Sequence, residues 1–310
     1  GRNARKEKAM NIALNHPVPL LELDVLRTFV AIVDTGSFAG AAETVFRTPS
    51  AVSMQIKKLE EMLGRPVLVR DSRAVSLTHE GEMLLEHARR VLALNREMMS
   101  RFIAPDIAGV VRLGTPDDVA ERFLPEMLRR FSDSHCGVTV NVAVESTTKL
   151  VEMVRQRTLD IALITCEAGF RGDGEAEVLY RERLVWAAAK CGVAAEQHPI
   201  PVSVWEEGCV WRKAGLSGLE KQGMDYRIAF QSAHISGQRA AILADLAVAP
   251  LPVSALTGAV VEADPKYGLP ELPDYALGII ISDDASVPVK AAADHLRACF
   301  TAVQANGRAV

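Results

Sequence analysis

The sequence predicts an α+β multidomain fold: a small helical module with a two-stranded wing, a long linking helix, and a C-terminal α/β domain of two lobes. Three patterns indicate this. Apolar residues recur at helical spacing between residues 26 and 63, and a heptad-like stripe runs from residue 84 to 102. From residue 109 onward, short apolar segments alternate with amphipathic ones, as strands and helices do in α/β domains.

The overall charge conceals an uneven distribution. The 310 residues are 49% hydrophobic and 24% charged, which excludes a disordered or collagen-like chain, and the formal charge is −4. Residues 1–105 have 15 basic and 12 acidic side chains, whereas residues 106–310 have 20 and 27. This division indicates that only the first part meets a polyanion.

No segment has the roughly 18 uncharged apolar residues that a membrane helix needs. Residues 1–20 include basic side chains with no apolar core after them, so we expect a flexible N-terminal arm, no signal peptide and no membrane partner, in a cytoplasmic protein. The chain has five cysteines: Cys136, Cys166, Cys191, Cys209 and Cys299. They form no Cys-x-x-Cys pair, and neither a metal site nor a cofactor is expected.

Two helices are predicted before residue 47. The first has apolar residues at the spacing of one helix face: Leu26, Phe29, Val30 and Val33. Gly36 suits the left-handed position that ends a helix. Ser37 can then cap a second, alanine-rich helix over Phe38–Phe46.

A third helix is predicted from Pro49 to about Leu63, with Thr48 as its N-cap. A helix, a tight turn and a capped helix together form a helix-turn-helix motif. The predicted DNA contacts on this helix are short, polar or basic side chains at its start and on its exposed face: Thr48, Pro49, Ser50, Ser53, Met54 and Lys57. A merely solvated helix face is the alternative.

Two short strands, residues 67–69 and 75–77, are expected to form a wing. Arg70 and Arg73 lie in or beside the turn between them and are predicted DNA contacts. Between Arg47 and Arg73 there are six basic and three acidic residues, so this surface is positive. We therefore expect residues 21–78 to form a winged helix-turn-helix domain that binds DNA.

A long linker helix is expected over residues 79–105, because Thr78 can cap it and its first turn is acidic. Its apolar positions step by three and four residues, with one polar member: Leu84, Ala88, Val91, Asn95, Met98 and Phe102. A second copy of the chain is the simplest partner for this stripe. Packing of the helix onto its own domain is the alternative.

Residues 109–310 are predicted to form two α/β lobes, lobe I from about 109–184 and 276–310, and lobe II from about 185–275. Lobe I begins with alternating strands and helices: Val110–Gly114, Ala120–Phe131, Val138–Val144, Thr148–Gln156 and Asp160–Ile164. This order predicts a parallel sheet with right-handed crossovers. A cleft between two such lobes is a usual place for a small ligand.

The chain resembles the LysR-type transcriptional regulators over nearly its full length from about Leu21. Many residue types in register carry the resemblance: Leu26-x-x-Phe29, Gly36-Ser37-Phe38-x-x-Ala41-Ala42, Ser50 to Glu60, Leu63-Gly64, Arg70 and Leu77-Thr78-x-x-Gly81. In the second half, Leu124-Pro125-x-x-Leu128-x-x-Phe131 and Leu159-Asp160-Ile161-Ala162 are similar. The sequence from Arg47 to Ser53 is most similar to that of the LrhA/HexA-like branch of the family.

This resemblance implies a homodimer or dimer-built homotetramer that binds promoter DNA. It also implies an effector domain similar to the periplasmic binding proteins, which takes a small-molecule effector, and it leaves room for RNA polymerase as a further partner. Pro49, Ser50 and Ser53 match base-facing positions, and Lys57 matches a phosphate contact. Many members have glutamine where this chain has Pro49, which cannot make a bidentate amide contact to adenine.

The predicted effector-binding residues follow strands or precede helices in the C-terminal part: Thr115, Asp117, Thr147, Thr148, Cys166, Cys209, Ser232 and His234. Hydroxyls and free N–H groups at helix N-termini suit carboxylate or other anionic ligands. Plain N-capping is the alternative for each residue. Cys166 ends its strand and is expected to point into the cleft.

Thiol redox sensing through Cys209 or Cys166 is an alternative signal. Cys209 lies close to where peroxide-sensing members of the family have their reactive cysteine, and Arg212 and Lys213 could lower its pKa. Their resolving cysteine is absent, because this chain has Gly218-Leu219 there.

An enzyme or a solute-binding protein on the same two-lobed fold is the alternative of a different class. The sequence has no Gly-x-Ser-x-Gly elbow, no complete dinucleotide-binding glycine motif and no histidine pair at ligand spacing. The absent signal peptide argues against a solute binder. No catalytic residue is therefore predicted.

Overall fold

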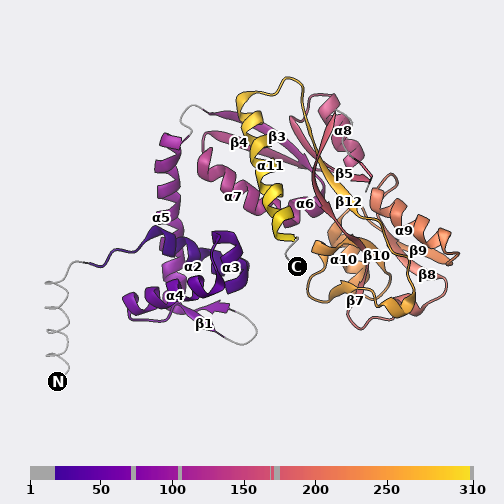
Figure 1. The fold of residues 1–310 in the computed structure, drawn as a ribbon, viewed down its shortest axis with the longest axis horizontal. Helices are drawn as coiled ribbons and strands as arrows, with labels where there is room; N and C mark the ends of the chain where they lie inside the picture. Colours follow the sequence, from indigo (N-terminus) through magenta and orange to yellow (C-terminus); the bar gives the residue numbers. More distant parts are fainter. Residues whose placement is uncertain (1–17, 71–74, 104–106, 168, 171–174, 308–310) are drawn as a thin grey trace. The chain divides into compact units, whose positions relative to one another are not determined.

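The computed structural model describes residues 18–70, 75–103, 107–167, 169–170 and 175–307 (Figure 1). They divide into two units, one up to Phe102 and one from Ile103 onward. No helix among these residues is long and apolar enough to cross a membrane.

The first unit contains the predicted three helices and the wing. Its helices are α2 (Leu23–Thr35), α3 (Phe38–Val45) and α4 (Pro49–Leu63), followed by β1 (Leu68–Arg70) and β2 (Val75–Leu77), which pair antiparallel. Gly36 ends α2 at a φ of 70°, and the hydroxyl of Ser37 accepts a hydrogen bond from the N–H of Gly40 at 3.0 Å. The predicted helix boundaries here are confirmed because local capping sets them.

The core of this unit holds α4 against α2 and α3. Phe29, Ile32, Val52 and Ile56 are completely buried. The hydroxyl of Thr28 also donates to the amide oxygen of Gln55 at 2.8 Å. One face of α4 is therefore used for packing, and its other face is left to solvent.

The two halves of the long helix α5 (His79–Ile103) differ in what covers them. Near its start, Leu84 and Leu85 pack against the core that α2, α3 and α4 form, and Ala88 is buried. Further along, large apolar side chains are exposed in the single chain: Val91, Leu94, Met98, Met99 and Phe102. The start of the helix thus packs on its own unit, whereas pairing with a second copy through the exposed half stays a prediction.

The second unit begins with a five-stranded sheet of order β4-β3-β5-β12-β6. Its strands are β3 (Gly109–Thr115), β4 (Val138–Val144), β5 (Ile161–Glu167), β6 (Ala176–Glu182) and β12 (Tyr275–Ile281). β3 is parallel to β4 and β5, whereas β12 is antiparallel to both β5 and β6. The parallel sheet predicted for the first three strands is confirmed for β3, β4 and β5. β12, which follows the other lobe in the chain, joins this sheet in the antiparallel direction.

Helices cover this sheet, and one of them differs from the prediction. The expected helix Ala120–Phe131 is two helices, α6 (Asp117–Arg122) and α7 (Leu124–Ser134). Pro125 has no N–H to continue the hydrogen bonds of α6, so the helix ends and a new one begins. The remaining helices of this lobe are α8 (Thr147–Arg155) and α11 (Val287–Gly307).

The other lobe has two small sheets. β7 (Leu184–Ala189) pairs antiparallel with β10 (Ala249–Pro252) and β11 (Val260–Glu262), and β8 (Ile200–Val204) pairs in parallel with β9 (Tyr226–Gln231). Its remaining elements are helices and short 3-10 turns: α9 (Val210–Lys221), α10 (Ile235–Leu243), η1 (Ala194–Glu196), η2 (Val253–Ala255) and η3 (Pro265–Tyr267).

Four of the strands and α-helices were not predicted: β6, β8, β11 and α9. Pro201 lies inside β8, and proline argues against a strand. Gly215 and Gly218 interrupt the helical pattern of α9, and they allow a close approach, because Cβ atoms there would lie 3.1 Å from the Pro250 and Pro270 side chains. Tertiary packing therefore overrides local preference at these positions.

Candidate functional site

The exposed face of α4 carries the predicted DNA contacts. Thr48, Pro49, Ser50, Met54 and Lys57 are exposed, and Ser53 is half-buried. The Thr48 hydroxyl caps the helix by accepting from the N–H of Ala51 at 3.2 Å. Ser50, Ser53, Met54 and Lys57 follow helical spacing and so form one face, opposite the buried Val52 and Ile56.

An ionic cluster fixes α4 relative to α2. Asp24 on α2 pairs with Arg27 and Arg47, each at 2.5 Å, and accepts from the amide of Gln55 on α4 at 3.2 Å. Partial burial opposes the charge of Asp24, but Arg27 and Arg47 lower its pKa. Arg47 therefore has a structural role as the residue that joins the turn to α2.

The predicted wing contacts are only partly visible. Arg70 ends β1, but its side chain lies outside the described part of the chain, as does the whole of Arg73.

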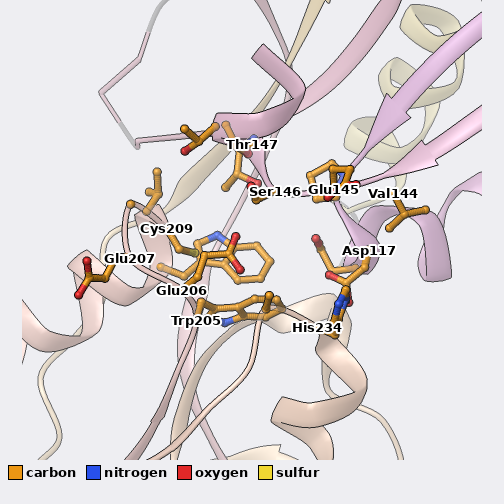
Figure 2. A pocket seen from close by; sticks show the side chains of 18 residues that line it. Asp117, Val144, Glu145, Ser146, Thr147, Trp205, Glu206, Glu207, Cys209 and His234 are labelled. Atoms are coloured by element: carbon orange, nitrogen blue, oxygen red, sulfur yellow. Dashed lines mark hydrogen bonds and ion pairs between the residues drawn. The ribbon is translucent and has the colours of Figure 1, made fainter. Parts of the chain in front are cut away.

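A cavity of about 190 Å3 lies between the two lobes of the second unit (Figure 2). The first lobe lines it with the start of α6, the end of β4, the start of α8 and Thr165. The second lobe lines it with residues 205–211 and with Ala233 and His234. Five of the eight predicted effector residues are among the lining side chains: Asp117, Thr147, Thr148, Cys209 and His234.

Asp117 connects the lobes across this cavity. Its carboxylate accepts a hydrogen bond from the N–H of Ile235, at the start of α10, at 2.5 Å, and lies 3.5 Å from the Nδ1 atom of His234. On the other side, Gly208 lies against α8, since a Cβ atom there would be 3.6 Å from the Thr148 hydroxyl. Contacts between the lobes therefore border the cavity on both sides.

Thr115, Cys166 and Ser232, which were also predicted to bind the effector, do not line this cavity. Thr115 is completely buried and its hydroxyl donates to the carbonyl of Pro116 at 3.2 Å. Cys166 is buried, 3.3 Å from the position of a Cβ atom at Gly278. Ser232 accepts from the N–H of His234 at 3.1 Å, which is the turn-stabilising role that N-capping residues have.

Several cavity residues were missed in the sequence. They are mainly acidic or aromatic: Glu145, Ser146, Trp205, Glu206, Glu207 and Trp211. Residues 205–207 follow β8. A prediction of this strand would have identified them as candidates for the cavity, because they come directly after its end. Glu145 and Ser146 follow β4, a strand whose end the sequence predicts correctly, so they could have been identified in the same way.

The cavity wall is acidic, and burial shifts its carboxyl groups. Burial raises the pKa of Asp117, although the N–H of Ile235 and His234 oppose this shift. Burial also raises the pKa of Glu206. Among the described residues, no group of three or more metal-ligating side chains is arranged to hold a metal ion.

The Cys209 thiol is not activated. Burial raises its pKa to about 11, and the N–H groups of Arg212 and Trp211 only partly oppose this. The guanidinium of Arg212 donates to the carbonyl of Trp205 at 2.8 Å, and Lys213 pairs with Glu167 at 2.6 Å. The expectation that these two cations lower the thiol pKa is therefore wrong.

Cys209 should react slowly with iodoacetamide in the native protein. At pH 8 only about one thiol in a thousand would be ionised for a pKa near 11, and only the thiolate attacks. Peptide mass spectrometry should find the exposed Cys136 and Cys191 labelled first, with Cys209 labelling accelerating about tenfold per pH unit. Labelling of Cys209 at the rate of Cys191 would restore the redox alternative.

Comparison with known proteins gives one consistent result. Residues 23–82 match the family described as "Bacterial regulatory helix-turn-helix protein, lysR family", and residues 105–301 match "LysR substrate binding domain". The HTH-type transcriptional regulator DgdR of Burkholderia cepacia is 36% identical over 283 residues, which are 90% of this chain and 94% of that protein. The HTH-type transcriptional regulator PecT of Dickeya dadantii is 31% identical, covering 84% of this chain and 81% of that protein.

The fold is similar to that of solved structures. One is Vibrio fischeri DarR in complex with DNA, with a TM-score of 0.50 and 16% identity, covering 90% of this chain and 99% of that one. Another is a LysR-family protein from Pseudomonas aeruginosa, with a TM-score of 0.50 and 22% identity, covering 90% and 99%. At these identities the likeness concerns the fold alone.

Proposed function

The chain belongs to the LysR family of DNA-binding transcriptional regulators, and from this we propose that α4 reads promoter DNA under the control of a small molecule bound in the inter-lobe cavity. The observation that carries the proposal is the capped, exposed face of α4, on which the short side chains Ser50 and Ser53 alternate with Lys57. Such a face fits a major groove.

Within this proposal, the residues of α4 divide by role. Ser50 and Ser53 reach base edges, Pro49 starts the helix and makes apolar contact, and Lys57 contacts a phosphate. The side chain of Lys57 is 69% exposed, and its distance of 3.9 Å from Glu61 makes only a weak ion pair. Its charge is therefore available to DNA.

Lys57→Ala should weaken binding to all DNA sequences about equally and lower the salt slope by roughly 1, because one counterion fewer is released. The measurement is fluorescence anisotropy of the full chain on DNA fragments enriched from a random library, at several salt concentrations. Lys221→Ala removes the same charge from the second unit and should leave the slope unchanged. An unaltered slope in Lys57→Ala would contradict the phosphate contact.

We place the active form as a homodimer or homotetramer in the cytoplasm, where promoter DNA and RNA polymerase are. The exposed apolar half of α5 supports pairing of two chains through this helix. Analytical ultracentrifugation tests it: Leu94→Lys together with Met98→Lys should yield monomers. A dimer that survives both changes would place the contact elsewhere.

A further inference from the structure

We propose that the cavity binds a small zwitterion, a molecule with an ammonium group and a carboxylate, such as a free amino acid. This inference rests on the proposed function, in which the cavity takes the controlling molecule. It departs from the purely anionic ligand that helix N-termini alone suggest.

The first observation is an excess of carboxylates around the cavity. Five acidic side chains line it: Asp117, Asp118, Glu145, Glu206 and Glu207. Arg122 neutralises Asp118 at 2.7 Å, and Lys149 pairs with Glu145 at 2.5 Å. Among the described residues, no cation lies within ion-pair distance of Glu206 or Glu207, so negative charge is left over.

Glu206 and Asp117 approach the middle of the cavity from two sides. Figure 2 shows them on either side of the space below Ser146 and above Trp205, with His234 beside Asp117. Both carboxyl groups are partly removed from water, which strengthens their attraction for a cation. A ligand ammonium group between them would be held by charge-assisted hydrogen bonds.

The second observation is a set of donors without acceptors on the opposite wall. Helix α8 starts at Thr147, and its N-cap Ser146 makes no side-chain bond to the first turn. Among the described residues, the N–H groups of Thr147, Thr148 and Lys149 have no acceptor. A carboxylate is the ligand group that suits such a helix start.

The third observation is a buried indole. Trp211 lines the cavity and is 2% exposed, and its Nε1–H has no acceptor among the described residues. The neighbouring Trp205, in contrast, donates to the carbonyl of Pro250 at 3.4 Å. Buried N–H groups are nearly always paired, so a ligand oxygen is the missing acceptor for Trp211.

A ligand with a single charge would pair either with the carboxylates of the cavity or with its N–H donors, but not with both. An anion without an ammonium group would meet the unpaired charge of Glu206, and a cation without a carboxylate would leave the α8 donors unpaired. The cavity of about 190 Å3 restricts the ligand to a small molecule. A zwitterion satisfies both walls at once.

The first experiment measures binding to the full chain without DNA. The standard L-amino acids are screened by thermal shift at about 10 mM, which detects even millimolar affinity. The tightest is then compared by calorimetry with its deaminated acid and its decarboxylated amine. We expect each analogue to bind about 10- to 100-fold more weakly, as loss of a charge-assisted hydrogen bond predicts. The proposal is overturned if no amino acid binds or if either analogue binds as tightly.

Variants locate the ammonium site. Glu206→Gln should weaken the best amino acid about 10- to 100-fold while binding of its deaminated acid does not weaken. Glu121→Gln, at an exposed position on α6 outside the cavity, is the matched control and should bind as the unaltered chain does. Equal affinity in Glu206→Gln and Glu121→Gln would overturn the proposal.

Trp211→Phe removes the indole N–H and keeps an aromatic ring. It should weaken the amino acid by about 3- to 10-fold, the effect of one neutral hydrogen bond. Gel shifts with DNA separate this inference from the proposed function. If the chain binds specific DNA but calorimetry finds no amino acid that binds, only the ligand class is refuted. If the chain does not bind DNA, the proposed function is refuted whatever the calorimetry shows.

Discussion

Arg122→Ala should destabilise the second unit by about 3–5 kcal/mol, because it leaves two buried carboxylates without their cation. The Arg122 side chain is 11% exposed and lies 2.7 Å from Asp118 and 3.4 Å from Glu182, whose side chains are even less exposed. It also donates to the hydroxyl of Tyr275 at 3.5 Å. No water can replace these contacts without entering the core.

Urea unfolding followed by tryptophan fluorescence measures this loss, since all three tryptophans, at 186, 205 and 211, lie in the second unit. Arg129→Ala is the matched control on α7, where a half-exposed arginine pairs with Glu126 at 2.7 Å and contributes less than about 1 kcal/mol. Equal losses in the two variants would contradict the buried network.

The deficit of Arg122→Ala should shrink as the pH falls. Burial raises the pKa of Asp118 in the folded chain, and without Arg122 only the N–H of Val119 opposes that shift. A carboxyl group whose folded pKa lies above its unfolded value takes up a proton on folding, which stabilises the fold increasingly at lower pH.

Gly81→Ala should destabilise the first unit by about 1–3 kcal/mol, although alanine favours a helix by about 1 kcal/mol over glycine. A Cβ atom at this position would lie 2.0 Å from the carbonyl oxygen of Val67 and 3.0 Å from the Leu77 side chain. The same carbonyl accepts from the N–H of Thr78 at 3.1 Å, so it cannot easily move away. The first turn of α5 would have to separate from the wing.

Far-UV circular dichroism during thermal unfolding tests this prediction, because the first unit has no tryptophan. DNA affinity should fall with it, as the wing shifts. Glu82→Ala, an exposed change in the same turn, should leave both stability and affinity nearly unaltered. A Gly81→Ala protein as stable as Glu82→Ala would mean that the close approach does not exist in solution.

The first unit could be predicted from sequence because its boundaries depend on neighbouring residues. Ser37 and Thr48 cap the helices that follow them, and Gly36 adopts the left-handed conformation that its place requires. The exposed face of α4 then follows from helical spacing alone.

The cavity could be predicted only in part, because its second wall comes from elements with contradictory local signals. Because Pro201 argues against a strand, β8 could not be predicted, and neither could the position of Glu206 after it. Cys166 was placed in the cavity by its position at a strand end, but side chains alternate along β5, so Thr165 faces the cavity and Cys166 faces the packed side. An error of one residue reverses such a prediction.

The exposed end of α5 has a consequence for dosage. If two chains must pair through this helix before they bind DNA, then promoter occupancy at low protein concentration rises with about the square of that concentration. Small changes in synthesis or degradation of the chain would then be amplified at its promoters. If the exposed apolar side chains from Val91 to Phe102 form that contact, the protein concentration would be a second signal beside the proposed ligand of the cavity.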